Sequence, residues 1–337
     1  MRKLATIRKI DEIRPIPDAD AIEAAVIGGW VVVIRKGEFA VGDFAIYCEL
    51  DSWIPHTIAP FLSKGHEPRT FEGIVGERLR TVKLRGVCSQ GLLLPLSVVD
   101  SDIELTEGTD VSENLGIVKW DAPIPAQLSG IVKGSFPSWG KRTDQERCQN
   151  LVDEIQQAYD NDVKFEVTIK LDGTSMSFGK SPDGEYTICS RNLNLKTDQS
   201  GNTLVNLCSK YEIERKLQDL PSIMLSGECI GEGVQKNKET IKGQDVYIFD
   251  VWDPIRQSYV SNDERYELVS KLGLKHVPIL HKSITLKELG LHNVFDILKY
   301  AEGPSLNAKS REGIVFKSVD GHFSFKAISN AWLLKNE

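Results

Sequence analysis

The sequence predicts an α+β protein of two domains, in which a small β-barrel precedes a domain built on antiparallel strands. The chain has 337 residues, which is enough for two domains with separate cores. Short apolar runs separated by glycine turns fill residues 1–118, whereas residues 143–337 combine alternating strands with helical segments. Residues 119–142 contain repeated proline and glycine, which is the composition of a linker.

The first domain consists of short strands, most of them bounded by turn residues. They are expected at residues 4–7, 22–26, 30–34, 44–50, 79–84 and 91–95. Five or six short strands of this kind indicate a small closed barrel of the OB type.

One surface of this barrel is basic. Four cations are expected along one strand region: Arg78, Arg80, Lys83 and Arg85. With Trp30 and Tyr47 available for stacking, this surface predicts contacts with a nucleic-acid backbone. A solvated charged edge that prevents strand-to-strand aggregation is the alternative interpretation.

A helix opens the second domain. Thr143 is expected to cap it, with Glu146 completing a capping box, and residues 151–159 continue it. The strands that follow end in polar residues, which a purely structural strand does not need. They are expected at residues 163–170, 187–192, 223–228, 246–252, 311–317 and 323–328, with helices at 264–271 and 293–301.

Lys170 ends the first of these strands. An Asp172-Gly173 turn follows, and residues 175–178 are expected to form the returning strand, which places Lys170 at a hairpin corner. A lysine fixed there suits a nucleophile. Because its ordinary pKa is about 10.4, attack at neutral pH requires burial or cationic neighbours that lower the pKa. The alternative is a solvated lysine on a surface hairpin.

Composition limits the partners and the compartment. The net charge is −7, so a nucleic-acid partner requires a local basic groove. The six cysteines form no Cys-x-x-Cys pair, which argues against structural zinc and disulfides and favours a reducing compartment. The N-terminus is too charged for a signal peptide, and no apolar stretch has the length of a membrane span. We therefore expect a soluble, intracellular monomer without a membrane partner.

An ordered set of motifs extends across the second domain. It reads Lys170-Leu-Asp172-Gly173, Ser190-Arg191-Asn192, Gly227-Glu228, Phe249-Asp250-Val251, Glu312-Gly313-Ile314-Val315 and Lys326. In this order the motifs closely resemble the covalent nucleotidyltransferase superfamily of ATP-dependent DNA and RNA ligases and mRNA-capping guanylyltransferases. Residues 233–238 also look like the RNA ligase pattern.

The order of the domains distinguishes members of that superfamily. DNA ligases and capping enzymes usually carry an OB domain after the last lysine motif, whereas here a barrel is expected before the transferase domain. Together with residues 83–86 and 89–95, the whole chain is similar to the nick-sealing RNA ligases of the Deinococcus and Naegleria type. The fold implied is an N-terminal OB domain followed by an antiparallel-sheet nucleotidyltransferase (adenylyltransferase) domain.

The resemblance implies an ATP-dependent RNA ligase that joins 3′-OH and 5′-phosphate ends through lysyl-AMP and polynucleotide adenylate. Its substrates would be ATP and RNA or an RNA-containing nicked duplex, and Mg²⁺ or Mn²⁺ would assist. The implied catalytic residues are Lys170 as nucleophile, Lys326 on the α-phosphate and Asp172 near the metal or the leaving group. Glu312 would bind the metal, Glu228 the ribose hydroxyls, Phe249 the adenine and Arg191 a phosphate.

Some of the implied contacts stay open. Ser324 stands where many relatives have the first of two lysines, so Lys317 is a second candidate beside Lys326 for the phosphates. Arg147 is a candidate for the β- and γ-phosphates, although a solvated helix start explains it equally well. The alternative functions are an ATP-dependent DNA ligase, a capping enzyme, and a non-catalytic OB-fold RNA-binding protein with a decayed transferase domain.

Overall fold

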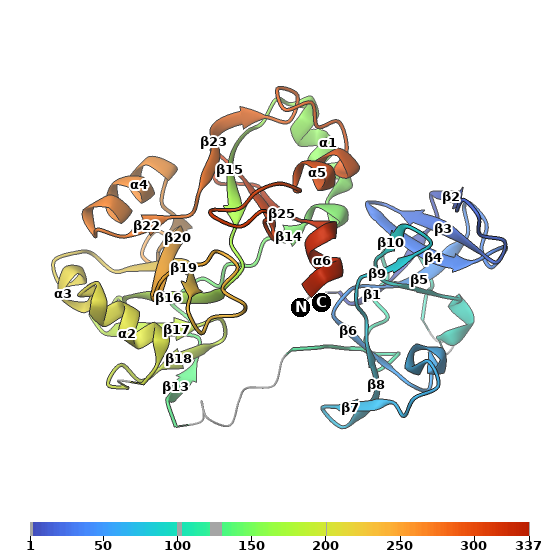
Figure 1. Cartoon of the computed structure of the whole chain (residues 1–337), viewed down its shortest axis with the longest axis horizontal. Coiled ribbons are helices and arrows are strands. Elements are labelled where there is room, and N and C mark those ends of the chain that lie inside the picture. Colours follow the sequence, from blue (N-terminus) through green and yellow to red (C-terminus); the bar gives the residue numbers. More distant parts are fainter. Residues whose placement is uncertain (1–2, 100–102, 122–129, 200, 337) are drawn as a thin grey trace. The chain divides into compact units, whose positions relative to one another are not determined.

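The computed structural model describes residues 3–99, 103–121, 130–199 and 201–336, and the chain divides into two compact units (Figure 1). Unit 1 comprises Met1–Pro123 and Leu333–Glu337, and unit 2 comprises Ile124–Trp332. Strands make up 37% of the structure and helices 17%, so the predicted α+β class is confirmed. Within the expected linker, residues 122–129 lie outside the described part of the chain. No described helix has the length and apolarity needed to cross a bilayer.

Unit 1 is built from short strands around two hydrophobic clusters. The elements are β1 (Ala5–Lys9), β2 (Glu12–Pro15), β3 (Ile22–Ile27), β4 (Trp30–Arg35), β5 (Phe44–Cys48), β6 (Ser52–Pro55), η1 (Pro60–Ser63), β7 (Arg69–Phe71), β8 (Ile74–Arg78), β9 (Val82–Leu84), β10 (Val87–Ser89), β11 (Leu92–Leu94), η2 (Leu96–Val98) and β12 (Val118–Lys119). They pair in the orders β1-β5-β11, β2-β3-β4 and β12-β6-β8-β7, with β9-β10 as a separate hairpin.

Two expectations for unit 1 are wrong. Trp30 and Tyr47 are buried, and their ring centroids lie 5.7 Å apart in the core, so neither ring is available to stack on a base. The expected strand at residues 79–84 is interrupted, because β8 ends at Arg78 and β9 begins only at Val82. The four cations therefore do not share one strand. Arg78 is moreover engaged within the unit, by an ion pair with Asp51 at 2.5 Å.

Unit 2 contains two sheets. The strands are β13 (Val132–Ser135), β14 (Glu146–Arg147), β15 (Lys164–Lys170), β16 (Thr174–Lys180), β17 (Tyr186–Ser190), β18 (Leu193–Leu195), β19 (Ile223–Gly231), β20 (Gln244–Asp253), β21 (Ser258–Tyr259), β22 (Lys275–His276), β23 (Ile279–Thr285), β24 (Gly313–Ser318) and β25 (Ser324–Ile328). One sheet has the order β13-β18-β17-β16-β19-β20-β21, with β22 also pairing with β20. The other has the order β14-β25-β24-β15-β23.

Helices cover the two sheets of unit 2 (Figure 1). They are η4 (Cys148–Asn150), α1 (Val152–Asp160), α2 (Thr203–Lys210), α3 (Ile213–Leu217), α4 (Asn262–Lys271) and α5 (Val294–Tyr300), and α6 (Asn330–Asn336) ends the chain. Apolar residues of α2, α3 and α4 join one core cluster with the eight-stranded sheet, and those of α1 and α5 join a second with the five-stranded sheet.

The expected capping box at the start of unit 2 is wrong. Thr143 lies in a loop, and Glu146 belongs to β14, which pairs in parallel with β25. The Glu146 carboxylate accepts hydrogen bonds from the Arg147 N–H at 2.8 Å and from the Asn150 amide at 3.1 Å. The helix α1 begins only at Val152, after the short helix η4.

The expected hairpin at Lys170 is also wrong. β15 pairs with β23 and β24, whereas β16 pairs with β17 and β19, so the chain crosses from one sheet to the other between Lys170 and Thr174. Gly173 permits the crossing, since a Cβ at this position would lie 2.3 Å from the carbonyl oxygen of Cys229. Lys170 therefore stands at the junction of the two sheets.

A buried ion pair joins β15 to α4. The Arg265 guanidinium donates to both carboxylate oxygens of Glu166 at 2.5 and 2.7 Å, and the Tyr266 hydroxyl also donates to Glu166. Glu166 is 0% exposed, and burial raises its pKa although Arg265 opposes the shift. The pair fixes the strand that carries Lys170 against the helical layer.

We predict that Arg265→Leu destabilises the protein strongly, because it leaves the Glu166 carboxylate buried without its cation. Breaking a buried pair in this way costs about 3–5 kcal/mol, which urea denaturation at pH 7.5 would measure. Arg215→Leu is the matched control, since Arg215 forms only an exposed pair with Glu212 and its loss is expected to leave stability nearly unchanged. Equal effects of the two substitutions would contradict the prediction.

Candidate active site

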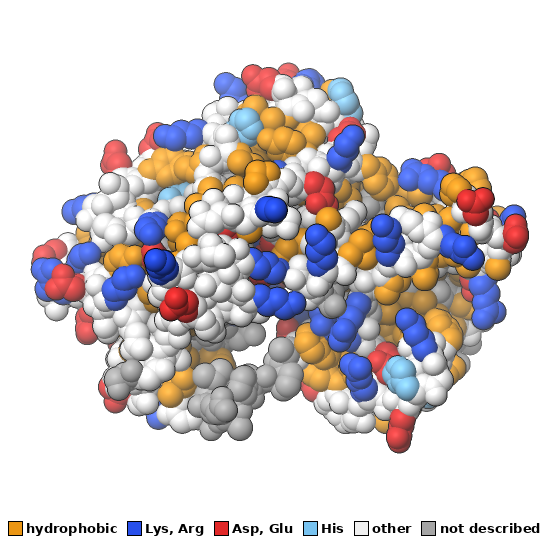
Figure 2. Space-filling view, viewed as in Figure 1, with side chains coloured by type: hydrophobic (Ala, Val, Ile, Leu, Met, Phe, Trp, Pro, Cys, Tyr) orange, Lys and Arg blue, Asp and Glu red, His pale blue; other side chains and the backbone are white. Residues whose placement is uncertain are grey.

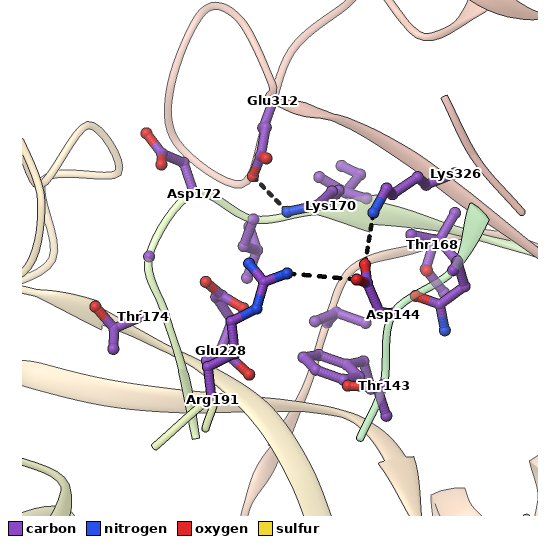
Figure 3. Close-up of a pocket in the computed structure, with 18 of the residues that line it drawn as sticks. Thr143, Asp144, Thr168, Lys170, Asp172, Thr174, Arg191, Glu228, Glu312 and Lys326 are labelled. Carbon is purple, nitrogen blue, oxygen red and sulfur yellow. Dashed lines mark hydrogen bonds and ion pairs between the residues drawn. The ribbon is translucent and has the colours of Figure 1, made fainter. Parts of the chain in front are cut away.

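A cavity of about 440 Å³ opens between the two sheets of unit 2 (Figure 3). Its lining combines the end of β15, the crossing to β16, residues of β19, β20, β24 and β25, and the loop before β14. The residues predicted from sequence that line it are Lys170, Asp172, Arg191, Glu228, Phe249, Glu312, Lys317 and Lys326. The volume lies in the range of small-molecule sites.

Lys170 faces Glu312 across this cavity. Its ammonium donates a hydrogen bond to the Glu312 carboxylate at 2.8 Å, and the two side chains are 29% and 13% exposed. Burial alone would lower the pKa of Lys170, but the carboxylates of Glu312 and Glu228 outweigh it and raise the pKa above its ordinary value. The expectation that neighbouring cations depress this pKa is wrong for the protein without ligand, because the nearest charges are negative.

Glu228 is the most perturbed carboxyl group of the cavity. Burial raises its pKa to about 8; Lys170 opposes the shift, whereas the nearby Glu312 and Asp172 carboxylates reinforce it. Glu228 is therefore largely protonated at neutral pH. A protonated carboxyl group both donates and accepts a hydrogen bond, which suits it to bind hydroxyl groups.

Asp172 and Glu312 are the oxygen donors best placed for a metal. Both line the cavity, and Asp172 forms an ion pair with Lys238 at 2.7 Å. Hydrated Mg²⁺ and Mn²⁺ are typically held by one or two carboxylates together with water and phosphate. The two side chains fit that donor set, since both place a carboxylate on the same cavity. No cluster of three or more metal-ligating side chains occurs in the described part of the chain.

Asp144 occupies the cationic side of the cavity. Its carboxylate accepts from the Lys326 ammonium at 2.7 Å and lies 3.4 Å from the Arg191 guanidinium (Figure 3). Burial lowers the pKa of Lys326, with smaller contributions from Lys170 and Arg147 in the same direction, and Asp144 opposes the shift. One exposed carboxylate therefore pairs with two cations that line the cavity and that an anionic ligand would contact.

Lys317 is tied to the wall of the cavity. Its ammonium donates to the Phe249 carbonyl oxygen at 2.8 Å and to the Asp250 carboxylate, which is buried. Burial lowers the pKa of Lys317, and Asp250 opposes the shift. These bonds join β24 to β20 and fix the backbone at Phe249, whose ring lines the cavity.

Comparison with known proteins agrees with this geometry. Residues 163–328 match a family model described as RNA ligase, and residues 4–96 match one described as an OB-fold domain. A solved structure of Naegleria gruberi RNA ligase with PPi is 45% identical, with a TM-score of 0.90, and the match covers 100% of this chain and 99% of that chain. No curated protein matches the sequence.

Two mutant structures of the same Naegleria gruberi RNA ligase are equally similar. The one with ATP and Mn is 44% identical with a TM-score of 0.89, and the one with AMP and Mn is 44% identical with a TM-score of 0.91. Each match covers 99% of this chain and 99% of that chain. The chain belongs to the RNA ligase family. The prediction of an RNA ligase with an OB-fold domain before the ligase domain is thereby confirmed.

The remaining predicted residue of the ligase lies outside the cavity lining. Arg147 is buried in β14, and its Cα pairs with that of Lys326 across the strands. It therefore lies beside a lysine of the site. Sequence reasoning missed Asp144 and Lys238, which hold the side chains of Lys326 and Asp172. Of these two residues, only Lys238 had a signal in the sequence, because it ends the segment 233–238 that resembles the RNA ligase pattern.

We predict that Glu228→Gln changes how the stability of the ligase depends on pH. Between its ordinary pKa near 4.5 and its pKa of about 8 in the folded protein, Glu228 keeps a proton that the unfolded chain releases. Wild-type stability therefore loses this contribution as the pH rises through that window, by at most about 5 kcal/mol at about 1.4 kcal/mol per pKa unit. Glutamine does not titrate, so the variant gains stability relative to the wild type from pH 5 to pH 8.

Urea denaturation of both proteins at several pH values between 5 and 8.5 measures the difference. Glu267→Gln, on the exposed side of α4, is the matched control and should give a difference that does not vary with pH. A pH-independent difference for Glu228→Gln would contradict the prediction.

Proposed function

We propose that this ligase uses ATP and a divalent metal to seal nicks in RNA-containing duplexes, joining a 3′-OH to a 5′-phosphate. It acts as a monomer in a reducing, intracellular compartment. The observation that carries the proposal is the convergence of Lys170, Glu228 and Lys326 on one cavity beside the ring of Phe249. The similar Naegleria gruberi structures contain ATP with Mn, AMP with Mn, and PPi, which are the ligands expected of nucleotidyl transfer.

The first step makes a phosphorus–nitrogen bond. The Lys170 amine attacks the α-phosphorus of ATP, the bond to the β-phosphate oxygen breaks, and pyrophosphate leaves. The amine must lose a proton first, because its pKa is raised in the free protein. The Glu312 carboxylate, 2.8 Å from the nitrogen, stabilises the charged amine, so a cation bound at Glu312 would favour release of the proton to solvent.

The cavity orients the nucleotide by its polar and aromatic walls. Phe249 provides a face for the adenine ring, and Glu228 provides a carboxyl group for the ribose hydroxyls. Lys326 and Arg191 bind phosphate oxygens once Asp144 has released them, with Lys317 as a second lysine near the same wall. Arg147 acts on this site through the charge it places beside Lys326.

Glu312 and Asp172 would hold a divalent metal, whose charge would neutralise the phosphates in the transition state. Neighbouring residues of the chain hold these two carboxylates in place. Lys238 holds Asp172 by an ion pair at 2.7 Å. The buried Arg311 donates to the carbonyl oxygens of residues 300–302, which fixes the backbone immediately before Glu312.

After adenylylation, the same centre completes the joining. The 5′-phosphate of the RNA attacks the lysyl-AMP phosphorus, so that AMP moves to the RNA and the Lys170 amine is released. The 3′-OH then attacks the 5′-phosphate, a phosphodiester bond forms, and AMP leaves. All three displacements occur at phosphorus, where positioning and charge neutralisation supply most of the catalysis.

We predict that Lys170→Met abolishes formation of the AMP adduct. Purified protein incubated with ATP and Mg²⁺ or Mn²⁺ should gain the mass of one AMP, measured by mass spectrometry without acid treatment because phosphoramidates are acid-labile. Lys164→Met, at the exposed start of the same strand, is the control and should retain the adduct. An adduct that persists in Lys170→Met would remove Lys170 as the nucleophile.

A nick-sealing assay distinguishes the proposed RNA ligase activity from that of a DNA ligase. Nicked duplexes with RNA or DNA on the 3′-OH side are offered to the adenylylated wild-type protein, and sealing of the RNA nick is expected to be faster. Equal or faster sealing of the all-DNA nick would overturn the proposed substrate while leaving the adenylylation step intact.

We predict that Asp144→Asn tightens nucleotide binding, because phosphates no longer compete with the Asp144 carboxylate for Lys326 and Arg191. The exposed pair with Arg191 is worth up to about 1 kcal/mol and the pair with Lys326, whose side chain is 19% exposed, adds to it, so the Kd for AMP should fall by roughly three- to tenfold in calorimetry without metal. Asp183→Asn, in an exposed turn, is the control. Unchanged or weaker AMP binding would show that Asp144 positions the two cations and does not compete for them.

A further inference from the structure

The hairpin β9-β10 of unit 1 carries two of the four cations that were expected along one strand region, Lys83 and Arg85, and Arg80 lies just before it. Leu84 pairs with Val87, so the loop consists of Arg85 and Gly86 alone. Both loop residues have positive φ angles, 46° and 85°, which is the two-residue turn favoured by the twist of a hairpin. The tip is therefore a defined structure and holds Arg85 at its end.

The base of the hairpin is anchored and its tip is exposed. The Ser89 hydroxyl accepts from the Val33 N–H at 2.9 Å, and the Gln90 N–H donates to the Val31 carbonyl oxygen at 2.8 Å, which fixes the return strand to β4. All of residues 82–86 are exposed, including Val82 at 38% and Leu84 at 42%. A partner can therefore reach the tip from outside the unit.

The segment of the chain that forms this hairpin carries charges of one sign. Residues 78–99 contain four cations and no carboxylate, in a chain whose net charge is −7. Arg78 is held by Asp51, but Arg80, Lys83 and Arg85 form no ion pair or side-chain hydrogen bond with any described residue. Figure 2 shows Lys and Arg side chains spread over unit 1, at the right of the view, together with several acidic side chains.

We infer that the hairpin β9-β10 binds the sugar-phosphate backbone of the nucleic-acid substrate. Arg80, Lys83 and Arg85 contact phosphates, and the exposed Val82 and Leu84 cover the sugars between them. A site built of unpaired cations without a carboxylate fits a polyanion, and phosphates are the same at every nucleotide, so recognition through them is independent of sequence. The inference rests on the proposed function, since that function supplies the polynucleotide.

The test uses the full-length ligase, without ATP, and a nicked RNA duplex that lacks the 3′-OH at the nick. The double variant Lys83→Gln/Arg85→Gln should bind the duplex roughly tenfold more weakly. The slope of log K against log salt should fall by about one for each phosphate that the variant no longer neutralises. The weakening should be the same for two duplexes of unrelated sequence.

Two controls isolate the hairpin. Lys83→Arg/Arg85→Lys keeps the charge and should retain both the affinity and the salt slope. Lys36→Gln removes an exposed charge from a turn that contains the Glu38 carboxylate, and it should leave binding unchanged. Wild-type affinity and slope in the double glutamine variant would overturn the inference, and would leave the hairpin as a charged edge or a surface for another partner.

Adenylylation distinguishes this failure from failure of the proposed function. The double variant should form the Lys170 adduct at the wild-type rate, which also shows that unit 2 is folded. An adduct in every protein combined with unchanged duplex binding overturns the hairpin alone. No adduct in the wild type overturns the proposed function, and with it the basis of the inference.

Discussion

The crossing of the chain between two sheets determines the active site. Because β15 and β16 belong to different sheets, the residues between them must bridge the gap, and Lys170 ends one sheet just before the chain enters the other. The crossing passes so close to Cys229 that only glycine fits at position 173. Each sheet then contributes side chains to the same space. Glu312 and Lys326 come from the five-stranded sheet and its edges, and Glu228 and Phe249 come from the eight-stranded one.

Charge within the cavity is balanced by pairing in the absence of ligand. Lys170 is paired with Glu312, both Lys326 and Arg191 are paired with Asp144, and Lys317 is paired with Asp250. An anionic ligand that binds one of these cations therefore has to displace the carboxylate that pairs with it. The solvent exposure of each carboxylate determines how readily its ion pair opens. Asp144 is 55% exposed, whereas Asp250 is buried, so the Lys326 and Arg191 pairs open at lower cost than the Lys317 pair.

The sequence predicted the residues of the site better than the strand pairing that brings them together. Ordered motifs on strand ends identified Lys170, Glu228, Glu312 and Lys326, and all four line the cavity. The partner strand of β15 was not predictable, because an Asp-Gly turn is equally compatible with a hairpin and with a crossing between sheets. The choice depends on strands more than 100 residues away in the sequence. Local patterns do not contain that information.

The errors in unit 1 have the same origin. Trp30 and Tyr47 have the composition of a stacking surface, yet their strands face a core that needs large side chains, and only the packed unit shows which face is buried. Leu79, which separates β8 from β9 in the sequence, is likewise buried in a core cluster that the sequence pattern does not show. The four cations are close together in the sequence. Only the tertiary structure shows that Arg78 is paired with Asp51 and that Lys83 and Arg85 lie on a separate hairpin.

The protonation of the cavity shows why nucleotide and cation must act together. In the free protein the nearby carboxylates, chiefly Glu312, outweigh burial and keep Lys170 charged, whereas burial raises the pKa of Glu228 and keeps it largely neutral at pH 7. The phosphates of a nucleotide add more negative charge, which by itself raises the pKa of Lys170 further and keeps the amine from attacking. In the proposed mechanism, a cation close to Glu312 would reverse that balance, because it would weaken the acceptor that stabilises the ammonium. On this proposal the arrangement would keep Lys170 protonated until both substrate and cation are present.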